Sequence, residues 1–350
     1  MRREFATRAL AFSLAATLGH GPTAAAQRQV PVQHAVPVVT FASRSRADDA
    51  ASGVVETEMR HVDFHIDSGV VLHIERLRGT LYATDTGKPA TLDDKSSFAL
   101  SLHSAEIAIN VQSLAVLLNR HVFGYQGAPL RKLRVRTEDG QLVQSGLLHK
   151  GIDMPFRIRA TITSMPDGRI RLHPTSVRVL GVGVTNAMKF FGVELDDVMK
   201  LPAGRGASID NNDFILDPLA ILPPPRIRGR LTSIVVGDGE IRQTFGAAPG
   251  QDVTPLRTPT AGTPNYMYFR HGTLRFGKLT MANADLLIVD ADPANNFDFS
   301  LDRYNDQLVA GHSASTSALG LVVHMPDFAT LGVKGSVTAR APKGAPASKP

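Results

Sequence analysis

Alternation of polar and apolar residues with a period of two runs through most of this chain, and it limits the possible folds more than any other feature. Residues 61–67 (HVDFHID) alternate in this way, and residues 69–78 continue the pattern after a Ser68-Gly69 turn. Successive side chains of a strand point to opposite faces, so such runs predict half-buried strands. Further extended runs lie at 97–109, 130–136, 141–149, 154–163 and 169–179, the last four separated by turns rich in Gly, Asp and Pro. Turns this closely spaced predict an antiparallel sheet.

Two stretches follow a helical period instead. Asn110 is placed as an N-cap and Gly124 as a C-terminal stop around an apolar stripe at i, i+3, i+4, i+7 and i+11, formed by Val111, Leu114, Ala115, Leu118 and Val122. Leu117 widens this stripe, so we expect the helix to be covered on more than one side. A second helix is predicted after Thr185 from the spacing of Met188, Phe191, Leu195 and Val198.

Composition shifts divide the rest of the chain. Residues 27–53 predict a flexible lead-in, and residues 336–350, rich in Ala, Pro and Lys, a disordered tail. Two short strands within 226–245 close a first module over 54–245, and 246–265 is expected to be a linker. Residues 266–335 form either a small β-rich module or an extension of the first sheet. Their expected strands are 266–276, 278–290, 297–301, 308–312 and 319–323.

The first 26 residues have the pattern of a Sec-type signal peptide. Three arginines, at 2, 3 and 8, precede an apolar run over 9–18, and Ala24-Ala25-Ala26 provides a cleavage site after Ala26. Ten apolar residues are too few to span a bilayer, which needs about 20, so cleavage is favoured over a permanent anchor. We therefore expect a periplasmic or secreted protein.

Composition excludes several kinds of chemistry. The chain has no cysteine, which rules out disulfides, zinc–thiolate and iron–sulfur sites, a cysteine nucleophile and the acylated cysteine of a lipoprotein. Removal of residues 1–26 takes away three Arg and one Glu, so 38 basic and 32 acidic residues become 35 and 31, and the net charge falls from +6 to +4.

Much of the positive charge lies on alternate positions of the expected strands. Arg134 and Arg136 alternate with apolar residues in one strand, and Arg157 and Arg159 do so in another. Adjacent strands would place these arginines on one cationic face, suited to anionic phospholipid headgroups or a membrane surface. An ordinary solvated sheet face is the competing interpretation.

No stretch carries a complete catalytic or metal-binding motif. His61, Asp63, His65 and Asp67 share one strand face, but the two histidines stand about 13 Å apart, so only a two-ligand fragment is expected and no metal is predicted. The acidic stretch 290–298 lacks the spacing of an EF-hand and predicts a turn. The sequence around Ser313 lacks the last glycine of a nucleophile elbow. We therefore expect a protein that is not an enzyme, with no cofactor and no nucleic-acid partner.

Four stretches carry a resemblance to a known family: 113–119 (SLAVLLN), 168–172 (GRIRL), 191–197 (FGVELDD) and 223–231 (PPPRIRGRL). With the order of their elements, residues 54–245 resemble the LmeA-like family of exported bacterial phospholipid-binding proteins, whose fold looks like the tubular lipid-binding (TULIP) fold. The resemblance implies an α+β fold in which a curved antiparallel sheet wraps around apolar helices and leaves an elongated groove for acyl chains. The C-terminal β-rich part lies outside it.

A groove of this kind draws on apolar residues from both helices and from the sheet. The expected lipid-binding residues are Leu114, Leu117, Leu118, Val122, Phe156, Ile158, Ile162, Met188, Phe191 and Leu195. Each also fits simple core packing. The expected function is binding or carrying of phospholipid, with the arginine face towards anionic headgroups. Two alternatives stay open: a structural or interaction module of the cell envelope, and an envelope hydrolase with an unrecognised site.

Overall fold

The computed structural model describes residues 54–179, 201–202, 204–247, 253–259, 262 and 264–332. Strands make up 58% and helices 9% of these residues, so the fold is mostly β, with open curved sheets. The sequence pattern suggested a larger helical share, but part of it, the helix expected from Met188, Phe191 and Leu195, lies outside the described residues. The expected signal peptide, lead-in and tail also lie outside them.

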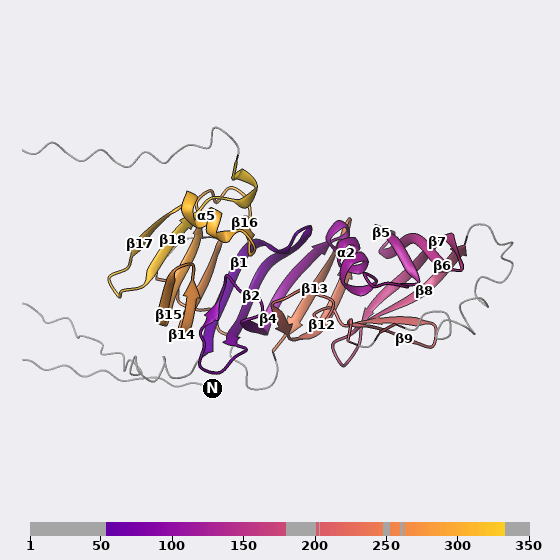
Figure 1. Ribbon diagram of the computed structural model, residues 1–350, viewed down its shortest axis with the longest axis horizontal. Helices are drawn as coiled ribbons and strands as arrows, with labels where there is room; N and C mark the ends of the chain where they lie inside the picture. The colour runs from indigo at the N-terminus through magenta and orange to yellow at the C-terminus, as the bar shows by residue number, and fades with distance from the viewer. Residues whose placement is uncertain are drawn as a thin grey trace, which may run out of the picture. The chain divides into compact units, whose positions relative to one another are not determined.

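The first sheet, sheet A, joins strands from both halves of the chain. Its main order is β12-β13-β4-β2-β1-β14-β15-β18-β17, and this succession is visible in Figure 1. The strands are β1 (Val54–Asp67), β2 (Val70–Ala83), β3 (Ala90–Thr91), β4 (Phe98–Asn110), β11 (Arg226–Arg228), β12 (Arg230–Val236), β13 (Glu240–Gly246), β14 (Tyr266–Phe276), β15 (Leu279–Asp290), β16 (Phe297–Ser300), β17 (His312–Ser315) and β18 (Leu321–Met325). Because β14 pairs with β1, strands β14–β18 extend the sheet begun by β1 and β2.

The antiparallel hairpin expected over 61–78 is formed by β1 and β2, but sheet A as a whole is mixed. Parallel pairs join β16 to β1, β11 to β4, β18 to β15 and β3 to β14. These pairs connect segments that are distant in sequence, so alternation within each strand could not reveal them.

Irregularities in three neighbouring strands change which residues face the interior. β1 has a left-handed residue at His61 (φ 48°), and the register between β2 and β4 shifts around Glu75 and again around His103. Inward residues of β1 stand at odd positions before His61 and at even positions after it. One extra residue in a strand reverses its alternation and bends it. The bends give sheet A a concave apolar face.

The second sheet, sheet B, is the meander expected from the sequence with two short strands added. Its order is β5-β6-β7-β8-β10-β9, formed by β5 (Leu130–Glu138), β6 (Gln141–Lys150), β7 (Ile152–Ser164), β8 (Ile170–Val179), β9 (Ala207–Asp210) and β10 (Asp213–Leu216). Three hydrogen bonds tie it to sheet A: Gly239 N donates to Thr137 Oγ1 (2.8 Å), Arg230 donates to Pro166 O (2.9 Å), and Ser164 Oγ donates to Thr232 O (3.5 Å).

The expected first helix is present. α2 (Val111–Leu117) continues into a π-helical turn over Leu118–Val122, and Asn110 caps it by accepting a hydrogen bond from Ser113 N at 2.7 Å. A side chain at Gly124 would meet the Arg120 carbonyl oxygen at 2.0 Å, which explains why the helix ends at a glycine.

The strand expected over 308–312 is wrong. Residues Tyr304–Ala310 form helix α5, β17 begins at His312, and a 3-10 turn follows at Phe328–Thr330. Tyr304 is buried against Phe276 and Phe299. The Gln307 side chain accepts a hydrogen bond from Ser300 N and donates to Asp298 O and Pro326 O. Tyr304 and Gln307 stand three residues apart, so a helix places both side chains on one buried face, which a strand over 308–312 would not do.

Candidate functional site

An apolar cavity lies between the inner face of sheet A, the inner face of sheet B and helix α2. Forty-three residues line it, and only Thr57, Gln144 and Gln243 among them are polar. The volume of this cavity is about 110 Å³. A buried side chain touches about 6–12 others. The lining is several times larger than the surroundings of one side chain, so the small open volume is spread among many residues of both sheets and α2.

The helix and sheet residues expected to bind lipid take two positions. Leu114, Leu117, Leu118, Ile158 and Ile162 line the cavity. Val122 (1% exposed) and Phe156 (4%) are buried in the surrounding core and do not line it. The other three expected residues, on the second predicted helix, lie outside the described residues.

Two of the polar lining groups are buried without a hydrogen-bond partner. Thr57 is fully buried, and its Oγ1 has no partner among the described residues; Gln243 Oε1 is in the same state. The residues directly across from Thr57 are Gly79 on β2 and Phe269 on β14, neither of which has a polar side chain. An unpaired buried polar atom is unfavourable, so these groups are candidates to contact a polar atom of a ligand.

The arginine face is formed as the alternation suggested, on the outer side of sheet B. One row across the meander strands β5–β8 consists of Arg134, Ser145, Arg157 and Arg178. Three of these four strands therefore contribute an arginine to the row. Arg136 and Arg159 flank Val143 in the next row.

One glutamate partly neutralises this face. Glu138 accepts from Arg136 (2.8 Å), Arg157 (2.9 Å) and Arg159, and the Arg159 hydrogen bond holds the pKa of its carboxyl below the usual value, helped by the charges of the other two arginines. Among the described residues, Arg134 and Arg178 have no carboxylate partner. The face keeps an excess of positive charge.

The histidine-rich and acidic stretches, residues 61–67 and 290–298, are far apart in sequence but line one polar pocket. β16 runs parallel to β1 and sets Asp298 beside Asp63. Asp63 bonds His73 (2.9 Å) and Asn296 (3.0 Å), while His65 bonds Asp298. The hydrogen bond that His73 donates to the Asp63 carboxylate raises the pKa of His73. Two His–Asp pairs thus lie side by side, a placement that only the parallel pairing reveals.

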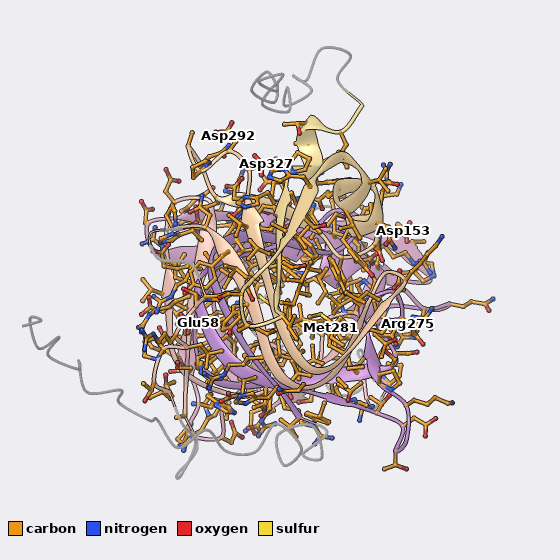
Figure 2. The ribbon with its side chains drawn as sticks, turned by 90° about the vertical axis from the view of Figure 1, so that its left-hand side faces the viewer. Glu58, Asp153, Arg275, Met281, Asp292 and Asp327 are labelled. Atoms are coloured by element: carbon orange, nitrogen blue, oxygen red, sulfur yellow. The ribbon has the colours of Figure 1, made fainter. Side chains whose placement is uncertain are left out.

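Asp327 closes one side of this pocket. Figure 2 labels it beside Asp292, away from Glu58. Burial, together with the charges of Asp290, Asp298 and Asp292, raises the pKa of Asp327 to about 6. Within the described part of the chain, no group of three or more His, Asp or Glu side chains is arranged to hold a metal ion.

On the outer face of sheet A, a short segment covers buried charges. Glu58 is 2% exposed and accepts from Leu256 N (2.5 Å) and Tyr266 OH (2.8 Å), while Arg78, 4% exposed, donates to Thr254 O (3.1 Å). Burial and the neighbouring Glu58 raise the pKa of Tyr266 to about 12. The segment 253–259 is therefore fixed to the sheet by hydrogen bonds to buried ionisable groups.

Ser313, the nearest approach to a nucleophile in the sequence, lies on the exposed strand β17. None of the helices in the described ranges has the length and apolar character needed to cross a bilayer. Comparisons of the chain with protein-family models, with curated proteins and with solved structures gave no match.

Proposed function

We propose that this protein is an exported phospholipid-binding or lipid-carrying protein that holds acyl chains in the cavity between its two sheets. The observation that carries the proposal is the apolar cavity between the two sheets, in which 40 of the 43 lining residues are apolar. Burial of each methylene contributes about 0.8 kcal/mol, so ten methylenes supply roughly 8 kcal/mol before the cost of ordering the ligand.

The size of the cavity favours a single chain as the first occupant. An apolar cavity of about 150 Å³ can hold benzene, whereas pockets for drug-sized ligands run to about 300–1,000 Å³. A space of about 110 Å³ must widen to take an acyl chain. Phe214, Leu216 and Leu219 are half-buried lining residues, so they belong to a part of the wall that can move outward without opening the fully buried core.

Two further parts of the proposal rest on the sequence. Helix α2 beside the apolar faces of curved sheets is compatible with the TULIP-like fold and the LmeA-like family that the resemblance implies. The signal-peptide pattern over 1–26 supports export to the periplasm or beyond the cell.

The arginine face on sheet B is proposed to meet anionic membrane surfaces. A basic residue near such a surface contributes about 1 kcal/mol. Joint replacement of Arg134, Arg136, Arg157 and Arg159 by Gln is expected to weaken binding to anionic vesicles and to flatten its salt dependence. Unchanged binding would show that these arginines form an ordinary solvated face with no role in membrane binding.

Lipid content tests the main proposal directly. The purified mature protein is extracted with organic solvent and the extract is analysed by mass spectrometry; delipidated protein is then offered a fluorescent acyl lipid. We expect phospholipid in the extract and saturable uptake. Absence of both would contradict lipid binding and favour the interaction-module alternative.

A pair of matched variants links uptake to the cavity. Leu219→Trp places a large ring in the half-buried wall and is expected to lower lipid affinity at least tenfold, whereas Leu279→Trp makes the same change on an exposed part of β15, away from the cavity. Equal affinity in both variants would place the lipid elsewhere.

A further inference from the structure

The short strand β11 separates the apolar cavity from a second, cationic pocket. Ile227 lines the cavity, whereas its neighbours Arg226 and Arg228 line an open pocket of about 500 Å³. This division follows from the alternation of side chains along a strand. β11 is held in place by parallel pairing with β4 from Ala99 to Ser101. Phe98, at the start of β4, lines both spaces, so the two pockets adjoin there.

The two arginines carry charge that the described residues do not neutralise. No carboxylate pairs with Arg226 or Arg228 in the described ranges. Arg228 instead lies over the ring of Tyr82, 5.8 Å from its centroid. Lys95, the third cation of the pocket, is bound to Asp302 (2.6 Å) and to Ile66 O (2.7 Å). The pocket therefore holds two positive charges free to meet an anion.

Tyr82 adds an unused donor to the same pocket. Its hydroxyl is buried and has no hydrogen-bond partner among the described residues. Tyr82 pairs with Ala99 on β4, and Ala99 pairs with Arg226, so the three residues form one row across the sheet. Residues two apart on a strand are separated by about 6.6 Å, which lets both guanidinium groups reach one ligand. Arginine binds phosphate through paired, directional hydrogen bonds.

We propose that Arg226, Arg228 and Tyr82 bind the phosphate group of an acyl lipid whose chain enters the apolar cavity beside Phe98. The inference rests on the proposed function and deepens it, because it assigns the bound headgroup to a site different from the arginine face of sheet B. The chemistry recognised is a phosphate oxyanion. A phosphorylated lipid and a free phosphate both supply it, and the site's junction with the cavity favours the lipid.

Two single-chain lipids that differ only in the phosphate test the proposal. The affinity of the delipidated, full-length mature protein is measured for a lysophosphatidate and for the monoacylglycerol with the same chain. Arg226→Gln/Arg228→Gln is expected to lower affinity for the lysophosphatidate at least tenfold and to leave affinity for the monoacylglycerol within twofold. Tyr82→Phe is expected to lower affinity for the lysophosphatidate about threefold or more.

Arg242→Gln/Arg275→Gln is the control, because it removes the same charge from exposed arginines outside both pockets. It is expected to bind both lipids like the wild type, and melting curves establish that all variants are folded. Equal losses for both lipids, or no loss, in a folded Arg226/Arg228 variant would overturn the phosphate site.

A binding measurement with inorganic phosphate alone shows whether the site takes free phosphate or the phosphate group of a lipid. If it binds the wild type as tightly as the lysophosphatidate does, the site serves free phosphate and the lipid assignment is wrong. A wild type that binds neither lipid refutes the proposed function itself. Binding of both lipids with equal affinity refutes only the phosphate site.

Discussion

Replacing Thr57 by valine removes a hydroxyl that the fold leaves unpaired. The side chain is fully buried in the apolar cavity wall, and valine has nearly the same shape. A buried polar group without a partner costs about 1–3 kcal/mol, so Thr57→Val is expected to raise the free energy of unfolding by about that amount. For a folded region of this size, the melting temperature should rise by roughly 2–12 °C.

Thermal unfolding followed by circular dichroism, on delipidated protein, measures this change. Thr163→Val is the matched control, because Thr163 is exposed on β7 and its replacement should change stability by less than about 0.5 kcal/mol. A melting temperature that stays the same or falls in Thr57→Val would show that the hydroxyl has a partner, such as an ordered water, and would refute the reasoning. If added lipid stabilises the wild type more than the valine variant, the hydroxyl contacts the ligand.

Three further changes test other parts of the structure. Leu117→Ala, at a fully buried position that lines the cavity, should cost about 2–5 kcal/mol in urea unfolding, and a loss below about 1 kcal/mol would contradict its place in the core. Asp327 has a folded pKa of about 6, above its ordinary value, so ionisation of this one carboxyl lowers the free energy of unfolding as pH rises from about 4 to 6. Asp327→Asn should therefore be more stable than the wild type by on the order of 2 kcal/mol at pH 7 and equally stable near pH 4, and parallel pH profiles would refute this. Glu58→Ala removes the acceptor of the Leu256 amide, so trypsin should cut after exposed Arg257 at least tenfold faster, and an unchanged rate would show that the segment is held by other contacts.

Local features of the fold could be predicted because they depend on neighbours in sequence. The β1–β2 hairpin, the β5–β8 meander and the Asn110 cap follow from alternation, turn residues and capping chemistry. The outward direction of Arg134 and Arg157 follows from the same alternation.

The polar pocket could not be predicted, because it depends on which strands are neighbours. Asp63 and Asp298 are separated by more than 200 residues, and each alone fits a solvated strand or a turn. Their proximity comes from the parallel pairing of β1 with β16, which alternation does not encode. Helix α5 was missed for a similar reason, since distant aromatic side chains bury Tyr304.

The cavity shows the same division between sequence and tertiary structure. Which side chains are apolar, and which face of each strand they occupy, can be predicted from residue type and a period of two. The arrangement of the strands in space is needed to show that the inner faces of sheets A and B enclose an apolar cavity, and that Arg226 and Arg228 lie just across β11 from it. The physical reason is that alternation assigns residues to faces, whereas the space between faces depends on strand order, on bulges and on pairings between distant segments.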